Sequence, residues 1–307
     1  MTAIHGQSTN VTMGMAYGIA AALIWGIWPV LSRLGVSETL TAFDITALRF
    51  GVSGLILLPL VFRHSTKNLG WKRALFLSCG AGAPYVLVMV TGLSLAPAGH
   101  AGVITPSCML IFSTIGSGLF LGDTLTRARR FGLPMIIVGV LLIGWDGFAN
   151  LSGDVLQGDI LFAVGGLLWA SYTVASRAWQ VDPVHATALV SVISMTLYLP
   201  FYVLMNEPHI LSAPLGEVLF QGLFQGVLAA SLGLIFYTRS VAILGASQGA
   251  VFAALVPGIA VLLAYPILGE VPSVHELIGV LVVSFGMVTA LGLLRFRQAT
   301  HPPARRA

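Results

Sequence analysis

Two aromatic pairs of equal spacing are the residues best suited to hold an organic ligand. Trp25 and Trp28 lie three residues apart in one apolar run, and Trp169 and Tyr172 repeat that spacing in another. Aromatic walls suit amphipathic molecules, and their faces attract cations such as amines. Packing between helices or an interfacial belt is the alternative. The mid-run positions of Trp25 and Trp169 argue against a belt, so we expect the pairs to face a central cavity.

Arg49 is the one basic residue well inside an apolar run, about eight residues and so roughly 12 Å from the end of its helix. A charge at that depth persists when it faces protein or water and has a partner. Asp44, on the same run, is one candidate partner, and backbone carbonyls of a broken helix are the other. Two roles remain open: Arg49 holds the carboxylate of a ligand, or it locks an outer gate.

Further polar groups stand near the starts of apolar runs, where His100, Gln248 and Tyr85 are expected to cluster. An imidazole that faces a cavity could exchange protons with water, and the alternative is a helix-end histidine bound to backbone or to a lipid headgroup. Gln221 and Gln225 lie one turn apart, and we interpret them as hydrogen-bonding groups between helices.

Enzymatic chemistry is not expected. His275 and Glu276 open like a zinc-protease helix, but the second histidine is missing. Cys79 and Cys108 fall in apolar runs without the spacing of metal ligands, and no glycine-rich phosphate loop occurs. We therefore expect no catalytic residue, no metal and no cofactor. The net charge of +4 comes from short basic clusters rather than one basic face, which disfavours nucleic acid as a partner.

The elements that must position these residues are membrane helices. The chain is 57% hydrophobic and only 8% charged, whereas soluble domains carry roughly 25% charged residues. Each apolar run approaches the roughly 20 residues that cross a bilayer. The runs cover about 14–34, 42–62, 74–95, 98–121, 130–147, 158–176, 185–205, 218–238, 247–268 and 274–294. This pattern predicts an all-α membrane protein of ten transmembrane helices.

Basic residues sort to one side of these helices. With the amino terminus inside, every Lys and Arg except Arg33 and Arg49 falls in or beside a cytoplasmic segment, as the positive-inside rule demands. Both termini are therefore predicted to be cytoplasmic, with a tail at 1–13 and another at 296–307. The lipid bilayer is the expected surrounding.

The chain also repeats itself. Trp25 and Arg33 recur 144 positions later as Trp169 and Arg177. A second set of residues recurs 147 positions later: Gly102, Gly122, Asp123, Gly132 and Gly139 become Gly249, Gly269, Glu270, Gly279 and Gly286. We predict two five-helix repeats, 14–150 and 151–295. Because five is odd, the second would be inverted relative to the first, the architecture of alternating access.

Ordered motifs over nearly the whole chain resemble the EamA-type branch of the drug/metabolite transporter superfamily. In the first half these are Ala-Leu-Ile-Trp-Gly at 22–26, Ala-Leu-Arg-Phe at 47–50 and Gly-Asp at 122–123. In the second half they are Phe-Tyr-Thr-Arg at 236–239, Leu-Gly-Ala at 244–246, Leu-Gly-Glu at 268–270 and Leu-Ile-Gly at 277–279. Asp123 departs from the family's frequent Glu. The resemblance implies a ten-helix carrier with both termini inside, commonly an exporter of amino acids or related metabolites.

Together these observations predict a secondary active carrier in the inner membrane that exports amino acids or similar small metabolites. Protons or a counter-transported solute are candidate coupling partners. Efflux of cationic or aromatic drugs is the alternative within transport. A membrane enzyme or a non-transporting scaffold is the alternative outside it; an enzyme would need acids or histidines converging on one face, whereas those of this sequence are isolated.

Overall fold

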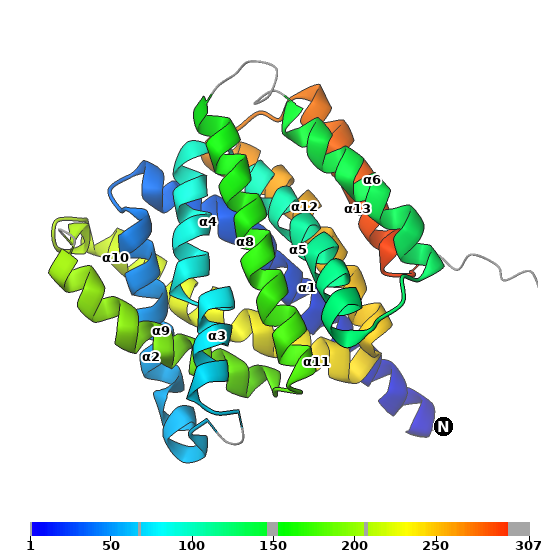
Figure 1. The fold of residues 1–307 in the computed structure, drawn as a ribbon, viewed down its shortest axis with the longest axis horizontal. Coiled ribbons are helices and arrows are strands. Elements are labelled where there is room, and N and C mark those ends of the chain that lie inside the picture. The colour runs from blue at the N-terminus through cyan, green and yellow to red at the C-terminus, as the bar shows by residue number, and fades with distance from the viewer. Residues whose placement is uncertain (1, 67–68, 146–152, 206–207, 294–307) are drawn as a thin grey trace, which may run out of the picture.

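The computed structural model describes residues 2–66, 69–145, 153–205 and 208–293, and all regular structure within these ranges is helical (Figure 1). The predicted C-terminal tail at 296–307 lies outside the described residues. The elements of the first half are α1 (Thr2–Ser37), α2 (Ala42–His64), α3 (Trp71–Ala81), α4 (Ala83–Leu95), α5 (Ala98–Leu121) and α6 (Arg127–Ile143). Those of the second half are α8 (Gly153–Ala178), α9 (Pro183–Met205), the 3-10 turn η1 (His209–Leu211), α10 (Leu215–Gly222), the π-helix η2 (Leu223–Leu232), α11 (Gly233–Leu244), α12 (Ala246–Leu268) and α13 (Val274–Ala290).

Eight helical stretches in the described ranges are long and apolar enough to cross a membrane. The all-helical membrane fold predicted from the sequence is therefore confirmed. Two of the ten predicted spans are shorter: α6 and α13 have 17 residues each, and α6 begins with basic residues. Because a span of average thickness needs roughly 20 residues, α6 and α13 are shorter than a typical membrane-crossing helix.

The first helix begins earlier than predicted. It starts at Thr2 rather than at residue 14, and its apolar part begins at Val11. Residues 2–13 contain no proline, the residue that most strongly stops a helix.

Two predicted continuous helices are irregular at mid-span. The third is divided at Gly82 into α3 and α4, and Pro84 opens α4. A Cβ at Gly82 would stand 2.3 Å from Ser78 O, which explains why glycine occupies this break. The eighth predicted helix contains η2 between α10 and α11. Hydropathy alone could not reveal either irregularity, because the mean hydropathy of both segments is as high as that of an unbroken span, 1.7 for Trp71–Leu95 and 1.8 for Leu215–Leu244.

Helices α6 and α13 pack side by side (Figure 1). Four glycines allow their backbones to approach closely. A Cβ on Gly132 would stand 2.6 Å from Gly286 O, and one on Gly139 would stand 2.8 Å from Gly279 O. Small residues at helix contacts are the usual means of close packing in membranes.

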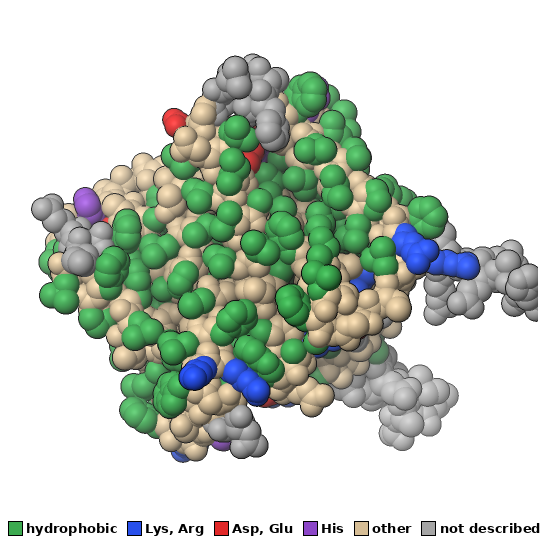
Figure 2. Space-filling model, viewed as in Figure 1, with side chains coloured by type: hydrophobic (Ala, Val, Ile, Leu, Met, Phe, Trp, Pro, Cys, Tyr) green, Lys and Arg blue, Asp and Glu red, His purple; other side chains and the backbone are tan. Residues whose placement is uncertain are grey.

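The surface is apolar where a soluble protein would be polar. Figure 2 shows hydrophobic side chains across the middle of one face, with Lys and Arg confined to its lower edge and right margin. Exposed side chains include Leu204, Phe62 and Leu262, with exposed fractions of 74% or more. Such a belt fits contact with lipid tails, as expected of a multi-pass membrane protein.

Candidate functional site

Arg49 lies buried in α2 without an acidic partner. Its side chain is 8% exposed, and Cζ stands 5.5 Å from the centroid of the Trp28 ring. Nη1 donates a long hydrogen bond of 3.5 Å to Gln225 Oε1, whereas Nε has no hydrogen-bond partner. Among the described residues, no carboxylate lies within 4.0 Å of this guanidinium. A buried charge without a counter-ion is costly, and an anion placed beside it would lower that cost.

The partner suggested by the sequence, Asp44, is wrong. Asp44 is the third residue of a capping box at the start of α2, where Thr41 N donates 2.7 Å to its Oδ2. Tyr202 of α9 donates to the other carboxylate oxygen. Five residues on a helix turn the side chain by about 140°, so Asp44 and Arg49 point to different faces.

Gln225 joins Arg49 to α1. Trp28 Nε1 donates 2.8 Å to its Oε1, and its Nε2 donates to Ser32 Oγ at 2.9 Å and to Gln221 Oε1 at 3.2 Å. Gln221 Nε2 in turn donates 2.8 Å to Leu31 O. The predicted cross-helix bonding of both glutamines is confirmed. Gln225 also contacts the site, a role that sequence reasoning missed; its position at mid-run, like that of Arg49, was the available signal.

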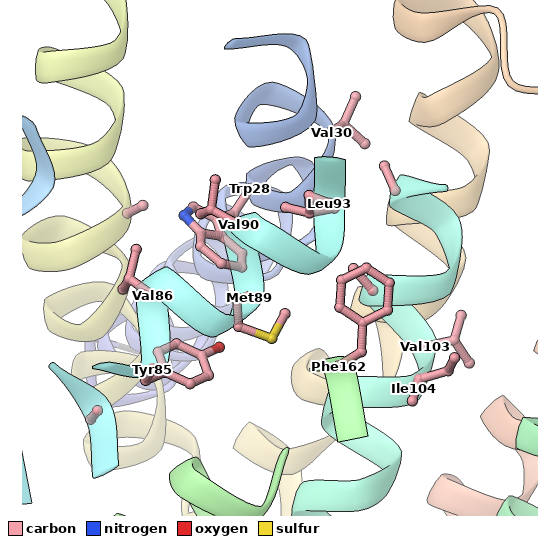
Figure 3. Packing of buried hydrophobic residues seen from close by; sticks show 14 of the residues in the cluster. Trp28, Val30, Tyr85, Val86, Met89, Val90, Leu93, Val103, Ile104 and Phe162 are labelled. Carbon is pink, nitrogen blue, oxygen red and sulfur yellow. The ribbon is translucent and has the colours of Figure 1, made fainter. Parts of the chain in front are cut away.

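Aromatic rings extend this site from three helices. Trp28 and Tyr85 are nearly parallel with centroids 6.4 Å apart, Tyr85 and Trp169 lie 4.8 Å apart, and Trp169 and Tyr172 lie 5.7 Å apart. Figure 3 shows Trp28 of α1 close to Tyr85 of α4, and Val86, Met89 and Val90 follow Tyr85 along α4. The structure therefore joins four of the predicted aromatic residues in one chain of ring contacts, of which Trp28 lies against Arg49.

Trp25 does not join this group. Its ring packs on Tyr237 of α11 with centroids 5.3 Å apart, and its Nε1 lies against Gly233. Three residues turn a helix by about 300°, which leaves Trp25 and Trp28 about 60° apart around α1. This angle directs Trp25 towards α11 and Trp28 towards α4.

Both irregular helices border the site. Helix α4 begins at Ala83, two residues before Tyr85, and Ala83 N donates 3.1 Å to Ser194 Oγ. The π-helix η2 contains Gln225. The amino-terminal end of a half-helix carries partial positive charge, and broken helices at corresponding positions of two halves are typical of transporter binding sites. Arg49 and the start of α4 are therefore both electrostatically suited to a negatively charged ligand.

His100 lies elsewhere, with partners that differ from the predicted group. Its Nδ1 is 2.8 Å from Asp159 Oδ1 and its Nε2 is 2.8 Å from Glu276 Oε1. Both ring nitrogens are thereby engaged, so neither Tyr85 nor Gln248 takes part. Gln248 is exposed near the start of α12. The predicted cluster of His100 with these residues is wrong, because the acids that bind it come from distant parts of the chain.

Two ion pairs link the halves of the chain. Arg33 pairs with Glu270, and its Nη1 also donates 2.7 Å to Ala96 O near the end of α4. Arg177 pairs with Asp123, with Nη2 3.0 Å from Oδ1. The hydrogen bond from Arg177 lowers the pKa of the Asp123 carboxyl below its ordinary value, and the charges of Arg177 and Arg129 act in the same direction.

Membrane-length apolar helices, two of them irregular beside a buried arginine and aromatic rings, are typical of transporter-type integral membrane proteins. The model of the EamA-like transporter family matches residues 12–145 and again residues 156–292. The chain belongs to this family, as its motifs indicated.

Relatives agree with this assignment. The chain is 26% identical over 193 residues to the uncharacterized transporter YyaM of Bacillus subtilis (strain 168), a match spanning 60% of this chain and 62% of YyaM. It is 22% identical over 279 residues to the uncharacterized transporter YoaV of the same organism, covering 88% of this chain and 93% of YoaV. An uncharacterized transporter of Archaeoglobus fulgidus is 24% identical, with 88% and 92% covered. One solved crystal structure shares the fold, with a TM-score of 0.62 and 21% identity over 92% of this chain and 98% of the other.

Proposed function

We propose that this protein is a secondary active carrier that exports amino acids or related carboxylate-bearing metabolites by alternating access. The observation that carries the substrate class is Arg49, a buried guanidinium without an acidic partner among the described residues. A ligand carboxylate would supply the missing charge. The fork of a guanidinium matches the two oxygens of a carboxylate, and the start of α4 adds partial positive charge beside it.

The aromatic rings around Arg49 define the rest of the ligand. Trp28, Tyr85 and Trp169 offer ring faces to an apolar or aromatic side chain, and the same faces attract an amino group. An amino acid carries all three features. Of the two roles open for Arg49, carboxylate binding is favoured over a gate lock, because a charged lock needs an acidic partner and the described residues place none within 4.0 Å.

Alternating access is supported by contacts that pair as a twofold operation would demand. Ion pair Arg33–Glu270 has the counterpart Arg177–Asp123, in which every residue is the repeat equivalent of one in the first pair. Gly132 faces Gly286 and Gly139 faces Gly279, which is again one contact and its repeat equivalent. An inverted pair of five-helix repeats, 14–150 and 151–295, accounts for both sets of contacts.

The same relationship gives the two ion pairs a role. In an inverted repeat, equivalent residues lie at opposite ends of the molecule, so the pairs would close opposite sides of the central site. Rocking of one repeat against the other would break one pair while the other stays closed.

The proposed setting is the inner membrane with both termini cytoplasmic. Reporter fusions test this topology: reporters after Lys67 and after Arg297 should read cytoplasmic, and one between Asn150 and Asp159 should read external. All three on one side would contradict the inverted repeat.

A screen of cells with and without the overexpressed chain tests the substrate class. Growth in toxic concentrations of amino acids or their analogues should improve for at least one carboxylate-bearing compound. Protection solely against cationic drugs would favour the alternative function, for which the aromatic rings are the supporting observation and the positive charge of Arg49 the opposing one. Protection against neither class would favour an enzyme or a scaffold.

A further inference from the structure

His100, Asp159 and Glu276 form a cluster that joins three helices, with His100 and Asp159 buried and Glu276 partly exposed. His100 is 2% exposed on α5, Asp159 is 8% exposed on α8, and Glu276 lies in the first turn of α13. The histidine comes from the first half of the chain and both acids from the second. Whatever changes the bonds of His100 therefore acts on the contact between the halves.

The hydrogen bonds of this cluster require a proton beyond those of a neutral histidine. A neutral imidazole has a single N–H and can donate to one carboxylate only. Yet both ring nitrogens lie 2.8 Å from a carboxylate oxygen. Two bonds to two acids need either an imidazolium or one protonated carboxyl group. The arrangement therefore contains one bound proton that its three side chains share.

Neighbouring groups hold the cluster in place without supplying that proton. Ser273 N donates 3.0 Å to Glu276 Oε2, so the capping box of α13 fixes this carboxylate and leaves Oε1 for His100. The other oxygen of Asp159, Oδ2, is buried without a hydrogen-bond partner. That atom gives the cluster capacity to bind a proton directly.

Charged groups on the surrounding elements are few. Glu270, between α12 and α13, accepts a hydrogen bond of 2.9 Å from Ala98 N and pairs with Arg33 of α1. Helices α4 and α12 carry no Asp, Glu, Lys, Arg or His, and the arginines of α6 lie at its opposite end. Asp154 of α8 and His275 of α13 are also titratable, but both are exposed, and the His275 ring lies 6.4 Å from the Trp145 ring. Among the described residues, proton exchange of the cluster is therefore governed by His100, Asp159 and Glu276, with the Arg33–Glu270 pair beside them.

A cavity connects this cluster to its surroundings. It has a volume of about 180 Å³, and His100, Glu270 and Glu276 are among its lining residues, with Pro97, Val103 and Val271. A site of this size admits several water molecules and so allows protons to reach His100.

We propose that His100, Asp159 and Glu276 form a proton-binding site that couples transport to protons, closing the Arg33–Glu270 end when the proton is bound. Loss of the proton leaves an imidazole nitrogen without hydrogen facing a carboxylate. Lone pair and negative charge then repel each other, which favours separation of α5 from α8 and α13. This inference rests on the proposed carrier function.

The first test measures this separation directly. Spin labels at Gln157 of α8 and at Val271 beside the cavity, in a chain with Cys79 and Cys108 replaced by Ala, report the distance between these points in the full protein. From about pH 6 to about pH 9 the distance distribution should shift to longer values. His100→Gln, a neutral amide, should abolish the shift, and the exposed His64→Gln is the matched control that should retain it.

A second test measures transport in vesicles that contain the carrier. A pH gradient should change the flux of a carried amino acid in the starting protein and in His64→Gln, and should not change it in His100→Gln or Glu276→Gln. If transport occurs but neither distance nor flux depends on His100, the proton site is wrong and the carrier function stands. If the distance shift depends on His100 but no amino acid is carried, the proposed substrate class fails and the proton site stands as a proton-dependent contact.

Discussion

Arg33 pairs with Glu270, and the residues at their repeat-equivalent positions, Arg177 and Asp123, pair with each other. Each pair takes its arginine from one half of the chain and its acid from the other. A pair that closes one end of a carrier should oppose opening at that end alone.

Exchange of the charges tests this role. Asp123→Asn should reduce exchange transport in vesicles several-fold, because one closed state loses its ion pair. The double variant Asp123→Arg with Arg177→Asp restores opposite charges and should recover part of the flux. Equal loss in the single and the double variant, at matched amounts of inserted protein, would show that the pairing itself is unimportant.

Acid should weaken the Arg177–Asp123 ion pair, because protonation removes the charge of the Asp123 carboxylate. The hydrogen bond from Arg177 lowers the pKa of Asp123 below the usual value of about 4. A lowered pKa in the folded state adds stability that is present above the unfolded pKa and is lost as pH falls through the folded value. The difference in thermal midpoint between the starting protein and Asp123→Asn should therefore be constant near neutral pH, begin to shrink below about pH 4 and vanish below the lowered folded-state pKa. A difference that grows on acidification would contradict this cause.

Close packing of α6 against α13 makes a sharp prediction for one glycine. A Cβ on Gly139 would stand 2.8 Å from Gly279 O and 2.9 Å from Val283 N, both backbone atoms. Gly139→Ala should therefore destabilise the protein by about 1–3 kcal/mol, as overpacking does. Gly258→Ala is the matched control, because a Cβ there meets nothing within 4 Å. Thermal unfolding in detergent measures both, and equal midpoints would refute the close contact.

The fold was largely predictable because it follows from composition. Apolar runs near 20 residues place the helices, and Ala98–Leu121 even has the predicted bounds. The breaks at Gly82 and in η2 were not predictable from hydropathy, since the residues around them are as apolar as their neighbours. Glycines stand at both places where another helix comes close, Gly82 against Ser194 and Gly226 against Val52.

The candidate site was predictable in its residue types but less so in its partners. Arg49 stood out as a charge inside an apolar run, and the aromatic pairs stood out by their repeated spacing. The partners of His100 could not be recognised in the sequence, because Asp159 and Glu276 lie 59 and 176 positions away and no local pattern links them to it. Asp44 was misassigned for the opposite reason: it is near Arg49 in sequence but on another face of the helix.

The aromatic residues should differ in their effect on transport. Trp169→Ala removes a ring that packs 4.8 Å from Tyr85 in the site and should raise the half-saturation constant several-fold. Trp25→Ala removes a ring that packs on Tyr237 instead and should affect transport less. Both variants should insert normally, which immunoblotting of membranes checks. An equal effect of the two would place Trp25 in the binding site as well.

The most direct test of the proposed function compares Arg49 variants in vesicles, with each amino acid and its carboxamide as the two probes. The starting protein should carry at least one amino acid and discriminate against its amide, because Arg49 binds the carboxylate. Arg49→Lys keeps the charge but loses the fork, so it should raise the half-saturation constant with an unchanged maximal rate. Arg49→Ala should abolish transport while leaving the protein inserted. Full activity of Arg49→Ala, or equal transport of acid and amide by the starting protein, would contradict the account.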